Sequence, residues 1–78
     1  MNKSRRVRID RIIEMIDELM SDVYVLYEEE NDAYENLPDS LKDSERGEAM
    51  YDAVSNLEDA YGSLEEANDY LECAKGEY

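Results

Sequence analysis

The chain has 78 residues, of which 22 are acidic and eight basic, and its net charge is −14 at pH 7. One cysteine and no histidine exclude an internal disulfide and an ordinary zinc site, and we expect no cofactor. No apolar run approaches the ~20 residues that span a bilayer. A single free thiol is typical of a reducing compartment, so we expect a cytoplasmic protein without membrane contact.

The first eleven residues are basic, with five Lys or Arg residues against Asp10 alone. We interpret residues 1–8 as a basic N-terminal arm. Positive charge suits the N-terminus of a helix poorly, so ion pairs with acidic residues near the C-terminus are expected to offset it. Contact of this arm with a membrane or nucleic acid, and a disordered arm, are the alternatives. The other 67 residues carry 21 acidic and three basic side chains, so we expect no direct nucleic-acid binding.

A heptad pattern predicts a first helix over about residues 9–36. With Ile9 as position a, the a and d positions are apolar except for Glu30. The e positions are apolar or aromatic as well, so the apolar stripe is broader than a two-stranded seam requires. The a and d series reads Ile9, Ile12, Ile16, Leu19, Val23, Leu26, Glu30, Ala33 and Leu37, and the e series reads Ile13, Met20, Tyr27 and Tyr34.

Residues 37–44 are predicted to form the hinge. Pro38 suits the first position of a single helical turn, and Leu37 and Leu41 are spaced to cover the end of the core. Ser44 is a natural N-cap for a second helix. Gly47 allows close approach of the backbone to Leu37 or Leu41.

A second heptad predicts a helix over about residues 45–75, closed by Gly76 and followed by a tail at 77–78. Its a positions are Met50, Leu57, Leu64 and Leu71. Its d positions are all alanine, which favours close packing of this ridge against the first helix. The alternative is that alanine is there as a good helix former. The d series reads Ala53, Ala60, Ala67 and Ala74.

The predicted fold is therefore all-α: one domain over residues 9–76, built as an antiparallel two-helix hairpin. The second helix alone cannot cover an apolar stripe that includes positions a, d and e of the first. We therefore expect a homodimer that forms a four-helix bundle. The residues expected on the core or dimer face are Ile13, Met20, Tyr27, Tyr34, Val54 and Tyr61.

Catalytic chemistry is not expected, because a base to activate a nucleophile is missing and the carboxylates lie on solvated faces. The acidic residues around the hinge form a negative tip that could bind a basic protein by imitating phosphate charge. A solvated face without a partner is the plainer interpretation. The candidate partner-binding residues are Glu28, Glu29, Asp32, Glu35, Asp39, Asp43, Glu45 and Glu48.

The hinge sequences Asn-Leu-Pro-Asp-Ser-Leu (36–41) and Ser-Glu-Arg-Gly-Glu-Ala-Met (44–50) resemble a pattern in short acidic helical-hairpin proteins of bacteria and temperate phages. The dipeptide Tyr61-Gly62 departs from that pattern. The resemblance implies a phage or prophage context and carries over no functional residues. Two hypotheses follow: a non-enzymatic, self-associating interaction protein, or an acidic inhibitor of a nucleic-acid-binding protein such as a host defence nuclease.

Overall fold

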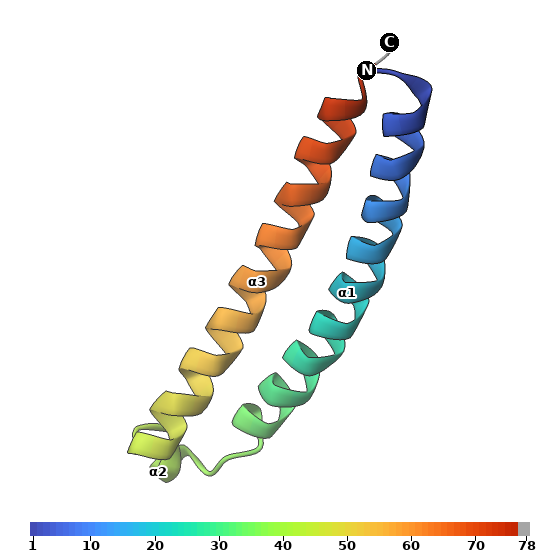
Figure 1. Cartoon of the computed structure of the whole chain (residues 1–78). Coiled ribbons are helices and arrows are strands. Elements are labelled where there is room, and N and C mark those ends of the chain that lie inside the picture. Colours follow the sequence, from blue (N-terminus) through green and yellow to red (C-terminus); the bar gives the residue numbers. More distant parts are fainter. Residues whose placement is uncertain (77–78) are drawn as a thin grey trace.

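The structure is a computed structural model that describes residues 1–76. In this range it has three helices: α1 (Lys3–Glu35), α2 (Asp39–Lys42) and α3 (Glu45–Lys75). The helices α1 and α3 run antiparallel, with the start of α1 and the end of α3 at one end of the hairpin and α2 at the other (Figure 1). The all-α prediction is confirmed for this part of the chain. The tail predicted at 77–78 lies outside the described residues.

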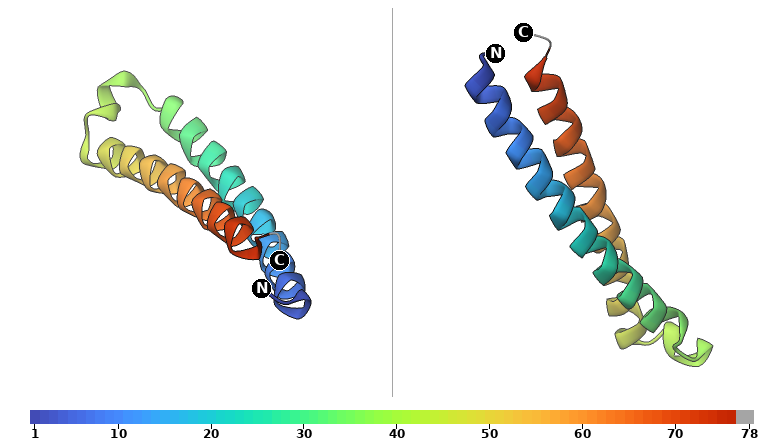
Figure 2. Two further views of the ribbon diagram at one scale, coloured as in Figure 1. Left: turned by 90° about the horizontal axis from the view of Figure 1, so that it is seen from above. Right: turned by 90° about the vertical axis from the view of Figure 1, so that its right-hand side faces the viewer.

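The hairpin is a rod with extents of 58 × 15 × 14 Å, and no third layer covers the two long helices (Figure 2). Its radius of gyration is 17.6 Å, whereas a compact domain of this length has about 11–12 Å. Consequently each long helix has one helical neighbour along most of its length. Among residues 1–76, no apolar side chain is fully buried.

Helix α1 begins at Lys3, six residues earlier than the sequence predicts, and takes in most of the segment interpreted as a basic arm. The cause is Asn2, whose side-chain oxygen accepts a 2.8 Å hydrogen bond from the Arg5 amide. An asparagine N-cap satisfies one of the free amides of the first turn. This capping outweighs the unfavourable charge of the first turn, which contains no acidic residue.

The hinge contains a single helical turn. The sequence predicts Pro38 at the first helical position, but Pro38 is the N-cap of α2 and Asp39 is the first helical residue. The Pro38 carbonyl accepts a 2.8 Å hydrogen bond from the Leu41 amide. Ser44 caps α3, with its hydroxyl accepting a 3.2 Å hydrogen bond from the Gly47 amide. Leu37 is half-buried at the end of the hairpin, but Leu41 is 47% exposed. The prediction that Leu41 covers the core is therefore wrong.

Gly47 is the buried contact between the hinge and α3. A Cβ atom at this position would come within 2.6 Å of the Lys42 carbonyl carbon, and closer still to the carbonyl oxygens of Leu41 and Lys42. No side chain fits in that space. The short distance between α2 and α3 thus depends on the glycine. The sequence predicts a close approach of Gly47 to Leu37 or Leu41, and the structure shows it for Leu41.

The seam between α1 and α3 follows heptad positions a and e. On α1 the e residues are half-buried, whereas Ile12, Leu19 and Leu26 at d are exposed. On α3, Ala60 and Ala74 at d are also exposed, while Ala53 and Ala67 are half-buried. The prediction of close packing along a continuous alanine ridge is therefore wrong. The physical reason is that one partner helix covers only two of three apolar columns, and the larger side chains at e occupy the seam.

Candidate interaction surfaces

Four pairs of residues fix how α1 and α3 are aligned. Each step along α1 from one pair to the next is matched by an equal step back along α3, so the alignment does not drift over the length of the rod. The alignment also places other residues: Ile12, Leu19 and Leu26 are level with positions 73, 66 and 59, each one residue before the d-position alanines Ala74, Ala67 and Ala60. The four pairs are Asp10 with Lys75 (2.7 Å), Asp17 with Asn68 (2.8 Å), Tyr24 with Tyr61 (ring centroids 5.8 Å apart) and Tyr34 with Tyr51 (5.9 Å).

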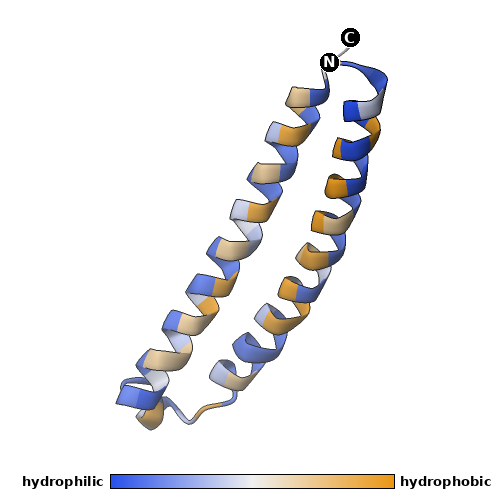
Figure 3. Cartoon of the chain, in the orientation of Figure 1, coloured by the Kyte–Doolittle hydropathy of each residue, from blue (hydrophilic) through white to orange (hydrophobic). Residues whose placement is uncertain are grey.

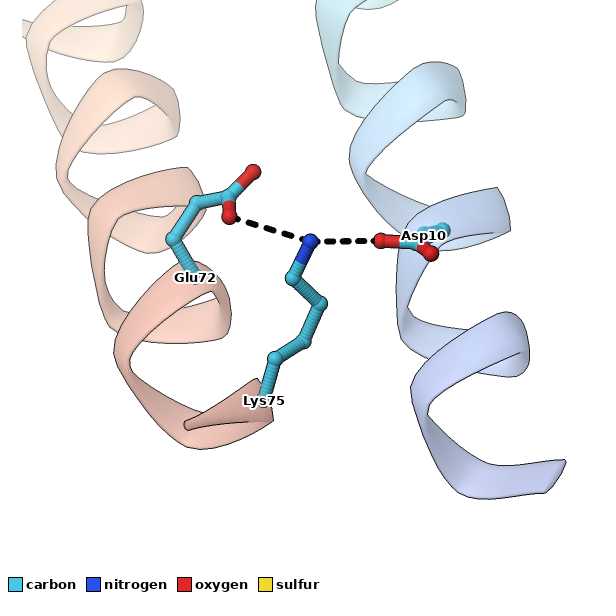
Figure 4. Close-up of polar contacts among 3 residues, drawn as sticks. All are labelled: Asp10, Glu72 and Lys75. Carbon is cyan, nitrogen blue, oxygen red and sulfur yellow. Dashed lines mark hydrogen bonds and ion pairs between the residues drawn. The ribbon is translucent and has the colours of Figure 1, made fainter. Parts of the chain in front are cut away.

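Lys75 ties the open end of the hairpin together. Its ammonium nitrogen lies 2.7 Å from an Asp10 oxygen on α1 and 3.1 Å from a Glu72 oxygen on α3 (Figure 4). The hydrogen bond to Asp10, followed by that to Glu72, raises the pKa of Lys75 above its ordinary value. Among residues 1–76, none of the basic side chains at positions 3–11 forms an ion pair. The ion pairs expected to offset the positive charge of the basic arm are thus not seen there. In the pair that joins the two helices, the acidic residue, Asp10, lies on α1 and the basic residue, Lys75, lies on α3.

Asn68 is the most buried polar side chain in the described range, with 8% of its surface exposed. Its amide nitrogen donates a hydrogen bond to Asp17 and lies 3.8 Å from the Met20 sulfur. Its carbonyl oxygen has no hydrogen-bond partner within the described residues. A polar residue in a helical seam favours one alignment at some cost in stability.

An exposed apolar surface runs along one side of the hairpin. Position d lies about 60° around the helix from position a, and in an antiparallel pair the d columns of both helices fall on the same side. Figure 3 shows hydrophobic residues recurring along α1 up to the section near the hinge, which is largely hydrophilic. On α1, Met15 lies beside the d column and is 51% exposed. We call this surface the outer apolar face; it consists of Ile12, Met15, Leu19, Leu26, Ala53, Ala60, Ala67 and Ala74.

The opposite side of the hairpin is charged. It carries the b positions of both helices, where Asp10 and Glu72 approach Lys75 and where Asp17 meets Asn68. A hollow of about 320 Å³ on this side is lined largely by acidic residues and Asn68. The two sides of the rod thus differ in chemistry: apolar residues recur along the outer apolar face, whereas carboxylates, Lys75 and Asn68 gather on the opposite side.

The residues predicted for the core or dimer face lie in the seam. All six are half-buried, and the Tyr24 and Tyr61 rings contact each other across it. The exposed residues that sequence reasoning missed are Ile12, Leu19 and Leu26, whereas Met15 was expected to leave apolar area uncovered. The signal for the three was present, since they are d positions of the heptad, but the sequence did not indicate which column α3 leaves uncovered.

The acidic tip is exposed at all eight predicted positions. These residues extend over the end of α1, the hinge and the first turns of α3. Lys42 lies 3.7 Å from both Glu35 and Asp39, and it also lies 5.3 Å from the centre of the Tyr34 ring. The tip is therefore a solvated acidic surface. Asp43 and Glu48 line an open hollow of about 300 Å³ beside Lys42, and the other six tip residues do not line it.

Within residues 1–76, no group of three or more Cys, Asp or Glu side chains is arranged to hold a metal ion, and neither long helix is apolar enough over its length to cross a membrane. Cys73 is a free, exposed thiol. Comparison with known proteins gives no match to a family model, a curated protein or a solved structure. Function must therefore be inferred from the surfaces themselves.

Proposed function

We propose that this chain is a non-enzymatic helical interaction protein that works as a homodimer through its outer apolar face. The observation that carries the proposal is the exposure of Leu19 and Leu26, at 53% and 52%, beside Ile12 at 40%, in a hairpin without a fully buried apolar residue among residues 1–76. Large apolar side chains that recur along one side of a helix and stay exposed are typical of a protein interface.

The exposed area supports the same proposal. The hairpin exposes 5988 Å², whereas a globular monomer of its mass, 9.1 kDa, exposes about 4,900 Å². The excess of about 1,100 Å² is larger than the ~800 Å² per partner of a standard interface. Pairing of two copies would bring the chain back to the exposure of a compact protein.

The test is the oligomeric state, measured by sedimentation equilibrium at tens of micromolar. The wild-type chain is expected to be a dimer, and Leu19→Glu a monomer at the same concentration. Val25→Glu is the matched control, because Val25 is as exposed as Leu19, at 52%, but lies on the side of α1 away from both the seam and the outer apolar face. A wild-type monomer, or equal loss of dimer in both variants, would contradict the proposal.

A second candidate function is inhibition of a basic nucleic-acid-binding protein by the acidic tip, in the phage or prophage setting that the hinge resemblance implies. The exposure of all eight tip residues favours it, since an exposed acidic surface accelerates association with a basic groove. The exposed thiol of Cys73 suits a cytoplasmic setting, which we propose for either function.

The experiment for this second function is capture of a DNA-binding protein from a bacterial lysate and its displacement by duplex DNA and by salt. Glu→Gln changes at Glu28, Glu29, Glu45 and Glu48 should weaken capture. The same number of Glu→Gln changes at Glu14, Glu18, Glu65 and Glu66, away from the tip, should leave it intact. If the two sets behave alike, the effect reflects net charge, and the tip has no specific role.

A further inference from the structure

We infer that the two copies pack antiparallel, with α1 against α1 and α3 against α3 of the second copy, and that the two-fold axis passes beside Leu19. This inference rests on the proposed homodimer and adds its geometry. Two-fold symmetry allows two ways to bring the outer apolar faces together. With the axis along the rod, each α1 meets α3 of the second copy and the two hinges lie side by side. With the axis across the rod, like helices meet and the hinges point in opposite directions.

Charge on the outer side of α1 decides between the two arrangements. Arg5 and Arg8 lie at the open end of this side, whereas Asp22 and Glu29 lie toward the hinge. All four are exposed, and none forms an ion pair with another residue of the described chain. The antiparallel arrangement places Arg8 opposite Glu29 of the second copy, and the two-fold axis forms this contact twice.

The other arrangement meets charge repulsion. It places the two hinge ends next to each other, and residues 28–52 carry ten acidic and two basic side chains. It also sets Arg5 and Arg8 against α3 of the second copy, where the d and g columns between positions 49 and 74 hold no acidic residue. Those columns consist of Ala49, Ala53, Asn56, Ala60, Ser63, Ala67, Tyr70 and Ala74.

The apolar residues fit the antiparallel arrangement in the same register. Leu19 is the midpoint of α1, which runs from Lys3 to Glu35. When Leu19 lies beside Leu19 of the second copy, Ile12 lies opposite Leu26 of that copy, because each of the two residues is one heptad from Leu19. The whole of α1 is then covered by α1 of the second copy.

The pairing of α3 with α3 of the second copy follows from the alignment of α1 and α3 within each hairpin. Ala67 lies within one residue of the level of Leu19, so it also lies close to Ala67 of the second copy, and Ala60 lies opposite Ala74. Small side chains at a helix contact allow a short distance between the axes. The alanine ridge, which the hairpin leaves exposed at Ala60 and Ala74 and half-buried at Ala53 and Ala67, would thus form the close contact between the two copies.

Cross-linking tests the register directly. In a Cys73→Ser chain, Ala67→Cys should cross-link to itself under mild oxidation, because the two copies of this position lie close to the axis. Ala60→Cys is the matched control: its two copies would lie about 20 Å apart along the rod, beyond the reach of a disulfide. A mixture of the Ala60→Cys and Ala74→Cys chains should form a mixed cross-link.

Charge exchange provides an independent measurement. Arg8→Glu and Glu29→Arg should each weaken self-association by about 2- to 30-fold, because each change removes two surface ion pairs. A mixture of the two variants should form a heterodimer in preference to either homodimer, since both contacts are then complementary. The double variant Arg8→Glu/Glu29→Arg should dimerise as the wild type does.

The possible results separate the two proposals. A monomeric wild-type chain overturns both the homodimer and its geometry. A dimer in which Ala67→Cys does not cross-link, and in which the charge variants show no preference for mixing, overturns only the antiparallel geometry. A dimer with both signals supports the register described here.

Discussion

Asn68 on α3 and Asp17 on α1 are joined by a 2.8 Å hydrogen bond between their side chains, the most buried polar contact of the seam in residues 1–76. The two partners differ in environment, because Asn68 is buried and Asp17 is exposed. Their substitutions should therefore have unequal effects. In Asp17→Ala the buried amide of Asn68 loses its acceptor, which costs about 1–3 kcal/mol of unfolding free energy.

Asn68→Leu, by contrast, replaces the buried amide with an apolar side chain and leaves Asp17 free to bind water. Its stability should equal or exceed that of the wild type. Urea unfolding at a fixed protomer concentration measures both effects, because self-association would otherwise shift the midpoint. Glu18→Ala, at an exposed position of the same helix away from the seam and the outer apolar face, is the control. Equal losses in Asp17→Ala and Asn68→Leu would contradict this account of the seam.

Substitution by alanine should also have unequal effects on stability at Gly47 and at Gly62. Gly47→Ala should lower the unfolding free energy by about 1–3 kcal/mol, because the added methyl group meets backbone atoms of α2 that cannot move aside cheaply. Gly62 has no atom within 4 Å of the corresponding position, so Gly62→Ala should raise stability by up to about 1 kcal/mol through helix propensity. Thermal unfolding followed by circular dichroism distinguishes the two. A stabilising Gly47→Ala change would mean that the hinge does not pack as described.

Ser44 should matter more than other serines of α3. Its hydroxyl accepts a hydrogen bond from the Gly47 amide and donates one to the Leu41 carbonyl, so it links the hinge to the first turn of the helix. Ser44→Ala should cost about 1 kcal/mol of unfolding free energy. Ser63→Ala, within the same helix, removes no cap and serves as the control in the same denaturation experiment.

The pH dependence of the Lys75 contact has a definite sign. The pKa of Lys75 is raised above 10.5 in the folded chain by its hydrogen bonds to Asp10 and Glu72. The charged form therefore stabilises the fold at any pH below the unfolded value, and this contribution is lost as the pH rises through the folded pKa. The difference in melting temperature between wild type and Lys75→Met should be constant from neutral pH to about 10 and should shrink above the ordinary lysine pKa. A difference that grows toward alkaline pH would contradict this assignment.

Much of the fold could be predicted from the sequence because each helix carries its own signals. The heptads predicted the long helices, and the Leu37-Pro38 step and Ser44 marked the end of one and the start of the other. The helical start at Lys3 was missed, although Asn2 is a common N-cap, because the net charge of the first turn argued against it. Local capping was stronger than unfavourable charge there.

The uncovered surface could not be predicted in the same way. Positions a, d and e of α1 are all apolar, and the heptad alone does not decide which two of the three columns face α3. That choice depends on the sizes of facing side chains across the hairpin, such as Tyr24 against Tyr61. Only the structure shows that Leu19 and Leu26 are exposed while Met20 and Tyr27 are half-buried.

The step-for-step alignment of α1 with α3 has a consequence for the length of the molecule. Residues 17–23 and 62–68 lie at the same levels of the rod, and each segment is one heptad long. Removing both segments together would shorten each long helix by one heptad and leave the Asp10–Lys75 and Tyr24–Tyr61 contacts in register. Removing only one would shift every contact on one side of the cut by seven residues. The hairpin can therefore be lengthened or shortened only by paired insertions or deletions in its two long helices.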